Sequence, residues 1–360
     1  MRGLKKNDLH ISLFDVYSAK DEYNSLKQDK LERSLSCNAK HDVFSPVVSN
    51  YLFENGFQPK YPENKKFAVC ISHDLDSLMH YPKHKVAPKY QGGFKNILSI
   101  FKYEIQSRFK KGIKEINESI HPSHIQKLAE EYGFKSSYYM LSLKDGEQDF
   151  NYQLEDVKSI IDDILKSGNE IGLHGGHKAY NSSEKIKQEK EYLAQFSNPK
   201  GYRNHFLRFK VPETWNYIQA NGFEYDTTFG FHDMIGFRNG MCYPHRPFDL
   251  NKNEFIDLVE VPLIVMDSSL IKYMNLNWEI AFQMVKKLID DIEEINGVFT
   301  ILWHNQMYTG ENRAFIKRVL DYLKKKDPWM PTSIELVAHY KTSGYLENIE
   351  KQVKALQKGE

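Results

Sequence analysis

Short apolar runs alternate with amphipathic stretches along most of this chain. Seven runs rich in β-branched and aromatic residues predict buried strands, at 65–72, 135–143, 170–174, 200–205, 223–228, 255–267 and 297–305. Between them, apolar residues recur at helical spacing in 154–169, 182–196, 211–222 and 277–296. Strands that alternate with helices pair in parallel, so the pattern predicts an α/β fold, either a doubly wound sheet or a barrel.

The two ends of the chain lack this alternation. Residues 1–62 are polar and weakly patterned, and we expect them to form an N-terminal extension of a main α/β region at 63–343. Residues 344–360 are expected to form a charged tail. Apolar residues at helical spacing in this tail suit either a short helix for self-association or a solvated terminal helix, and they are Leu346, Ile349, Val353 and Leu356.

Composition and charge narrow the class of protein. The net charge is +1, which argues against nucleic-acid binding by bulk charge. No run approaches the roughly 18 apolar residues of a membrane span, and no signal peptide is recognisable, so we expect a cytoplasmic protein. Three cysteines without metal-type spacing fit reduced thiols. A basic amphipathic stretch at 94–109 suits packing on the protein's own core better than contact with an anionic membrane surface.

Polar side chains with catalytic chemistry stand where the predicted strands end. The carboxyl ends of parallel strands meet at one face of an α/β fold, where active sites gather. A single aspartate at such a place is explained by capping of the next helix. Capping does not explain why this placement recurs at several strand ends. The recurrence predicts an active site built from Asp74, Asp76, His174, Arg203, Asp226, Asp267 and His304.

Two short motifs favour a metal at this site. In SHDLD, Asp74 and Asp76 point to the same side of an extended strand, where two carboxylates repel unless a cation or a shared proton relieves them. In LHGGH, His174 and His177 stand three residues apart. Each motif alone is common in polar turns and solvated loops, but an aspartate with two histidines is a frequent ligand set of catalytic zinc sites.

Six blocks in order resemble the polysaccharide deacetylases (NodB-homology, carbohydrate esterase family 4). The blocks are SHDLD, EIGLHGGH, GYRNHFLRF, FEYDTTFGF, LVEVPLIVMD and FTILWHN, and the resemblance covers about residues 67–340. It implies a distorted (β/α) barrel of about seven parallel strands. It also implies a metal-dependent hydrolase that removes an N- or O-acetyl group from a sugar of a glycan or glycan precursor.

The resemblance implies a role for each matched ligand. Asp74 matches the general base, Asp76 the metal-binding carboxylate and His174 the first histidine ligand. The second histidine of the family stands four residues later, where this chain has Lys178, whose protonated amine has no lone pair. The third ligand is then His177 or His205, and we favour His177 because the two glycines before it can turn the loop back. Zinc suits these donors best, and iron, cobalt or nickel also fit.

The resemblance also implies the proton-transfer groups. Arg203 matches the arginine that orients the base, and His304 matches the acid that protonates the leaving group. Asp267, in preference to Asp226, is expected to set the charge state of His304. Without a protonated leaving amine, cleavage of an amide C–N bond would stall.

Substrate contacts are expected from the loops around these residues. Arg238 and Arg246 stand in the aromatic segment 230–250, which suits either a substrate pocket for phosphate or carboxylate groups or a lid packed by its own side chains. His205 and Asp226 are further candidates for substrate contact. The expected substrate is an intracellular sugar precursor linked to a nucleotide or lipid. The alternatives are a metal-free sugar-binding pseudoenzyme, which Lys178 favours, and a hydrolase of a non-sugar amide.

Overall fold

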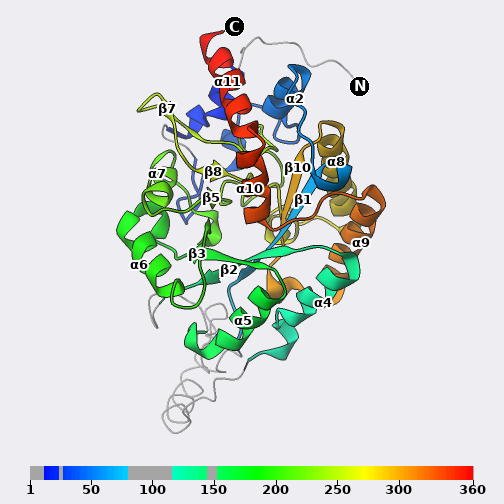
Figure 1. The fold of residues 1–360 in the computed structure, drawn as a ribbon. Helices are drawn as coiled ribbons and strands as arrows, with labels where there is room; N and C mark the ends of the chain where they lie inside the picture. Colours follow the sequence, from blue (N-terminus) through cyan, green and yellow to red (C-terminus); the bar gives the residue numbers. More distant parts are fainter. Residues whose placement is uncertain (1–11, 24–26, 80–115, 144–151, 360) are drawn as a thin grey trace, which may run out of the picture.

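The computed structural model describes residues 12–23, 27–79, 116–143 and 152–359. Eight strands, paired in parallel throughout, form one sheet in the order β8-β5-β4-β3-β2-β1-β10-β9 (Figure 1). Their bounds are β1 Ala68–Leu75, β2 Ser136–Leu141, β3 Glu170–Gly175, β4 Gly201–Asn204, β5 Tyr225–Asp226, β8 Val259–Glu260, β9 Val265–Met266 and β10 Val298–Leu302. β6 Phe248–Asp249 and β7 Glu254–Phe255 form a separate antiparallel pair.

The sheet curls because consecutive strands occupy its opposite edges. Four residues, 261–264, join the end of β8 to the start of β9, and they can span at most about 18 Å. A flat sheet of eight strands would hold its edges about 34 Å apart. The predicted (β/α) barrel is therefore confirmed, with eight strands rather than about seven. The single strand predicted at 255–267 instead contains the end of β7 and two strands of the large sheet, β8 and β9, which are separated around Pro262, a residue with no N–H to donate to a sheet.

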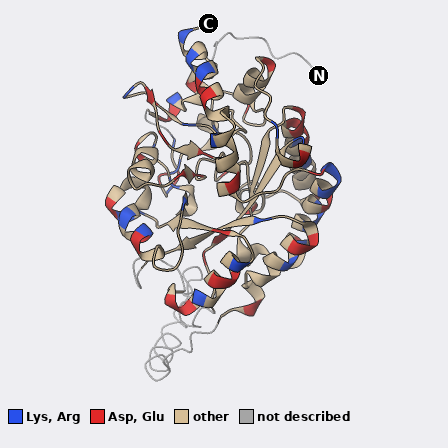
Figure 2. Ribbon diagram, in the orientation of Figure 1, with Lys and Arg blue, Asp and Glu red and all other residues tan. Residues whose placement is uncertain are grey.

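Helices cover the outside of the curled sheet, and charged side chains gather on them (Figure 2). α8 follows the sequence prediction: the Asn277 side chain accepts from the Ile280 N–H at 2.9 Å to begin the helix, and buried apolar residues recur every three or four positions. The bounds of these helices are α4 Ser123–Tyr132, α5 Lys158–Lys166, α6 Ser183–Leu193, α7 Glu213–Ala220, α8 Trp278–Glu294, α9 Gly310–Lys326 and α10 Ser333–Thr342.

The N-terminal segment packs against the barrel. It contains α1 Leu13–Tyr17 and α2 Val47–Glu54, joined by 3-10 turns that include Lys20–Tyr23 and Ser36–Asn38. Its apolar side chains belong to the same core cluster as the strands, and among them are Phe14, Tyr17, Val48, Leu52, Phe57 and Tyr61. The sequence shows no clear period here because each short helix contributes only two or three buried positions.

The predicted C-terminal helix forms as α11, Tyr345–Lys358. Its apolar stripe, Leu346, Ile349 and Val353, is buried and contacts α1 and α10. Arg246, beside the β6–β7 hairpin, donates to Glu350 at 2.5 Å and Glu347 at 3.2 Å. The apolar stripe of α11 is thus covered by other parts of the same chain.

Replacing Ile349 with alanine should lower the free energy of unfolding by about 2–5 kcal/mol, because the side chain is fully buried. Urea titration monitored by circular dichroism measures this loss. Lys351→Ala, on the exposed side of the same helix, is the matched control and should change stability by less than about 0.5 kcal/mol. Equal stabilities of wild type and Ile349→Ala would mean that α11 contributes nothing to the fold.

The amphipathic stretch at 94–109 lies outside the described residues. Within the described ranges, no helix is both long and apolar enough to cross a membrane. Cys70 and Cys242 are buried and Cys37 is exposed, and all three are free thiols.

Candidate metal centre and active site

The strands open into a cleft of about 250 Å³ at their carboxyl ends. Asp74 lies in β1 and Asp76 directly after it, while His205 and His304 follow β4 and β10. Ion-pair distances connect most of the strand-end side chains predicted from the sequence, and the connected residues are Asp74, Asp76, His174, Arg203, His205, Asp267 and His304.

Asp76, His174 and His205 form a group with the donors of a metal site. One ligand atom from each lies within 4.8 Å of the others. His174 Nε2 is 3.3 Å, and His205 Nε2 3.6 Å, from Asp76 Oδ1. Asp76 Oδ1 and His174 Nε2 are buried and make no hydrogen bond within the described residues. A buried polar atom without a partner costs about 1–3 kcal/mol, which a cation between them would offset. The residues therefore fit a divalent metal.

The local backbone aims both histidines at this point. His174 Nδ1 donates to the Arg203 carbonyl oxygen at 3.0 Å, which leaves the lone pair of Nε2 to face Asp76. His205 begins a tight turn after β4, in which Phe206 and Leu207 adopt φ of 62° and 54°. This turn brings the His205 ring back over the strand end.

His177 stands outside the ligand group. Its ring lies 5.6 Å from the His205 ring and 4.5 Å from the Phe206 ring, and it is not among the three residues whose ligand atoms converge. Arg208 Nη1 donates to the His177 carbonyl oxygen at 2.8 Å, which holds this backbone beside the turn after β4. Lys178 is exposed. The preference for His177 as third ligand therefore gives way to His205.

The protonation states of the group suit cation binding. Burial opposes the charged form of Asp76, but His205, His174 and His304 hold its pKa well below the usual range. Burial lowers the pKa of His205 to about 3, so its imidazole is neutral at pH 7. Burial also opposes protonation of His174, yet Asp74 and Asp76 raise its pKa. A bound cation would take the place of that proton, because metal ligands must be deprotonated.

Asp74 and Arg203 form a buried ion pair beside the metal ligands. Arg203 Nη1 lies 3.0 Å from Asp74 Oδ1, and the guanidinium also donates to Ser72 Oγ and to Thr227 Oγ1. Its carbon stands 4.4 Å from the centre of the Tyr139 ring. Because Oδ1 is engaged, Oδ2 is the oxygen left to face His174 Nε2, 3.6 Å away, and His304 Nε2, 4.0 Å away.

His304 is held by Asp267. Its Nδ1 lies 2.7 Å from Asp267 Oδ1, and its backbone N–H donates to Oδ2 at 2.6 Å. Nε2 then faces the cleft, 3.7 Å from Asp76 Oδ2. Although burial opposes its protonation, Asp267 and the two cleft carboxylates raise the pKa of His304 to about 10. The ring is therefore cationic at neutral pH and has a proton to give.

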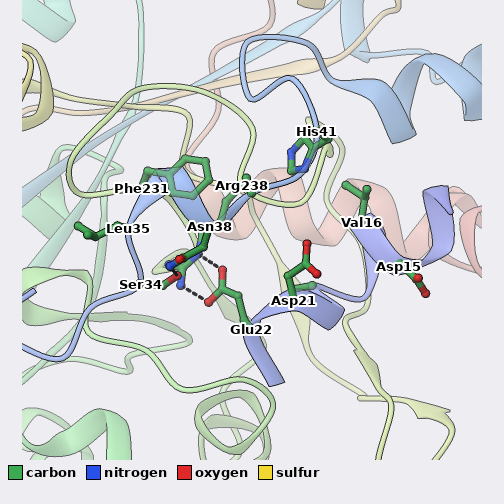
Figure 3. A pocket seen from close by; sticks show the side chains of 12 residues that line it. Asp15, Val16, Asp21, Glu22, Ser34, Leu35, Asn38, His41, Phe231 and Arg238 are labelled. Atoms are coloured by element: carbon green, nitrogen blue, oxygen red, sulfur yellow. Dashed lines mark hydrogen bonds and ion pairs between the residues drawn. The ribbon is translucent and has the colours of Figure 1, made fainter. Parts of the chain in front are cut away.

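Three predicted substrate residues lie elsewhere. Asp226 is fully buried and accepts from Thr228 Oγ1 at 2.6 Å; burial raises its pKa to about 6. Arg238 donates to both carboxylate oxygens of Glu22, at 2.7 and 2.6 Å (Figure 3). Arg246 pairs with α11. None of the three lines the cleft. The two arginines of the segment 230–250 are therefore paired with carboxylates from the N-terminal segment and from α11, away from the cleft.

Most other cleft-lining side chains were not indicated by the sequence patterns, and among them are Arg33, Phe206, Lys272 and Tyr273. Arg33 comes from the weakly patterned N-terminal segment, and Lys272 and Tyr273 lie in a π-helix, Ser269–Tyr273. Single-turn π-helices are frequent at functional sites, but no sequence period identifies them. Phe206 directly follows a candidate ligand, which is the signal that could have identified it.

No family model and no curated protein sequence matches this chain. Solved structures match its fold. A structure assigned as a polysaccharide deacetylase from Mycobacterium smegmatis has a TM-score of 0.53 at 13% identity, covering 79% of this chain and 94% of its own. Puue allantoinase has a TM-score of 0.54 at 14% identity, covering 84% of this chain and 98% of its own. A structure assigned as a polysaccharide deacetylase from Pseudomonas aeruginosa PAO1 has a TM-score of 0.52 at 15% identity, also covering 84% of this chain and 98% of its own. The resemblance read from the sequence blocks is thus confirmed for the fold.

Proposed function

We propose that this chain, whose fold is that of the polysaccharide deacetylases, is a hydrolase that uses a divalent metal to remove an acetyl group from a sugar of a glycan or glycan precursor. The observation that supports this most is the convergence of Asp76, His174 and His205. In the part of the chain that the structure describes, a buried side-chain atom of Asp76 and one of His174 make no hydrogen bond. Nitrogen and oxygen donors of this kind suit zinc, and iron, cobalt and nickel accept them as well.

The residues around the group have complementary roles in amide or ester hydrolysis. A divalent ion held there lowers the pKa of water and polarises a carbonyl oxygen. Asp74 Oδ2 takes a proton from the attacking water, while Arg203 keeps Oδ1 engaged and fixes the orientation of the carboxylate. His304, cationic and held by Asp267, gives a proton to the leaving nitrogen or oxygen.

The cleft has the size and lining for a sugar unit. Its volume is about 250 Å³, and the aromatic rings of Phe206 and Tyr273 line it. Phe206 is 39% exposed, which is unusual for an aromatic side chain and leaves ring surface for the C–H faces of a sugar. Lys272 adds a positive charge at the same cleft.

Two other functions remain as alternatives. The pseudoenzyme was suggested by Lys178, but a ligand group that includes His205 does not need a histidine at that position. Hydrolysis of a non-sugar amide is favoured by the likeness to an allantoinase. Release of acetate from acetylated sugars, measured beside hydrolysis of allantoin by the same preparation, separates these two hydrolases.

His205→Ala should abolish acetate release and weaken zinc binding by more than the roughly 10- to 100-fold that loss of a ligand's hydrogen-bond partner costs. His177→Ala is the matched control, since its ring contacts the same turn but lies outside the ligand group. Zinc affinity is measured by competition with a chromophoric chelator, and acetate by a coupled assay on N- and O-acetylated sugars.

Each other outcome points to a different conclusion. If His177→Ala loses zinc and His205→Ala keeps it, the ligand set is incorrect but the metal hydrolase stands. If wild-type protein holds no divalent metal and chelation changes nothing, the metal hydrolase is excluded and the pseudoenzyme is favoured.

A further inference from the structure

We infer that Arg33, in the N-terminal segment, is a positioning residue for the metal centre: it holds the turn that presents His205. The inference rests on the proposed function, because it assigns Arg33 a role only if His205 is a ligand. It goes further in making a segment outside the strand-and-helix alternation part of the site.

Arg33 connects three parts of the cleft wall. Its side chain is buried, with 5% of its surface exposed. Nη1 donates to the Phe206 carbonyl oxygen at 3.2 Å, and Nη2 donates to the Tyr273 hydroxyl at 2.9 Å. Nε and Nη2 also donate to Asp29 Oδ2 at 2.9 and 2.5 Å. With these bonds most of its five N–H groups are engaged, so the guanidinium serves the protein rather than a ligand.

The turn that Arg33 contacts requires external support. Phe206 and Leu207 adopt φ of 62° and 54°, a left-handed conformation that is costly for residues with a Cβ atom. Such a turn persists only where its surroundings fix it. The Phe206 ring also stacks on the His205 ring, with centres 4.0 Å apart and planes 20° apart. A bond to the Phe206 carbonyl therefore restrains the residue that immediately follows the ligand and covers its ring.

Arg33 is itself held in place. Asp29 Oδ1 accepts the backbone N–H groups of Leu31 and Arg33, at 2.9 and 3.0 Å, while Oδ2 accepts the guanidinium. Three residues further on, the Asp233 carboxylate accepts the Ser36 N–H and hydroxyl at 3.1 and 2.9 Å. The segment is thus closed on itself by Asp29 and attached to the barrel at Ser36, so Arg33 is a rigid support for the turn.

Arg33→Met keeps the length of the side chain and removes every donor. It should weaken zinc binding by about 10- to 100-fold, the effect typical of losing a group that orients a ligand. Arg33→Lys should weaken zinc binding less than Arg33→Met, because a single ammonium keeps the charge near Asp29. It cannot reproduce the planar set of hydrogen bonds, so some affinity should still be lost. Bound cobalt should show a changed visible absorption spectrum in both variants, since the His205 donor shifts.

Arg238→Met is the matched control. Arg238 is also a buried arginine that pairs with the N-terminal segment, through Glu22 (Figure 3). Its guanidinium carbon lies 4.2 Å from the centre of the Phe229 ring. Among the described residues its hydrogen bonds go to Glu22 and to the Gly230 carbonyl oxygen rather than to the turn at 205–207, and it does not line the cleft. The thermal midpoint of the metal-free protein should fall in both methionine variants, whereas zinc affinity and the cobalt spectrum should change only at Arg33.

The experiment can overturn the inference in distinct ways. If Arg33→Met binds zinc as tightly as wild type, Arg33 does not position the ligand, although the metal site stands. If Arg238→Met weakens zinc binding as much as Arg33→Met does, the effect is general destabilisation and the inference fails. If wild type binds no zinc, the proposed function fails together with it. Should Arg33→Met not fold, Arg33→Lys and Tyr273→Phe decide on the same measurements, and unchanged affinity in both contradicts the role.

Discussion

Replacing Asp74 with asparagine should lower kcat for acetate release by roughly 10³-fold or more, within the range that a general base contributes. The substitution keeps the shape of the side chain, and its amide oxygen can still accept from Arg203, which lies 3.0 Å from Oδ1. It removes the negative charge on Oδ2 that would take the proton from water. Because Asp74 is outside the ligand group, the metal should remain bound.

Asp76→Asn is the matched comparison for this variant. It makes the same change from carboxylate to amide at the neighbouring aspartate. Because Asp76 is in the ligand group, both zinc binding and activity should be lost. Metal content, circular dichroism and kcat are measured on the two variants side by side. Asp74→Asn hydrolysing acetylated sugars at the wild-type rate would show that another group is the base.

The alternation of strands and helices predicted the parallel α/β sheet, and the family resemblance selected the barrel. The sequence also indicated most of the strand-end side chains that the structure brings together, for a physical reason. A strand buried on both faces is largely apolar, so the wholly buried run 67–71 at the start of β1 stands out even in a single sequence. The polar residues with which such strands end then lie at the carboxyl ends of parallel strands, where they face one another. That rule brought Asp74, His174 and His304 together without any knowledge of the contacts between them.

The choice between His177 and His205 depends on where the backbone turns, and the positions of the glycines in the sequence indicated the wrong turn. The glycines of LHGGH suggested a loop that turns back toward His174. In the structure Gly175 is the last residue of β3, where a Cβ atom would stand 2.1 Å from the Tyr202 hydroxyl. Gly175 therefore permits close packing rather than a turn. The actual turn, at Phe206 and Leu207, has positive φ without any glycine.

Long-range charge pairing explains the remaining errors. Arg238 and Arg246 were expected to be available for a substrate, because the local pattern does not reveal their distant partners. Their partners, Glu22 and Glu350, are more than 100 residues away in opposite directions. The same long-range packing makes the N-terminal segment part of the cleft wall. Such pairs follow from the tertiary fold and have no signature in local patterns.

Replacing His304 with alanine should separate amide from ester hydrolysis. An amine leaves only once it is protonated, so the rate on an N-acetyl sugar should fall by about 10²- to 10⁴-fold. A phenolate leaves without prior protonation, so the rate on an aryl acetate should fall by less than about 10-fold. Metal content should not change, since His304 lies outside the ligand group, although its Nε2 is 3.7 Å from Asp76 Oδ2.

Asp267→Asn extends the same test to the residue that holds His304. Its carboxylate accepts from His304 Nδ1 at 2.7 Å, and its charge raises the pKa of this ring more than any other group does. An asparagine keeps a polar contact but removes the charge that stabilises the cationic ring, so the amide rate should again fall more than the ester rate. The two substrates are compared at saturating concentration for wild type and both variants. Equal losses on amide and ester in His304→Ala would contradict the acid role, because only protonation of the leaving group distinguishes the two reactions.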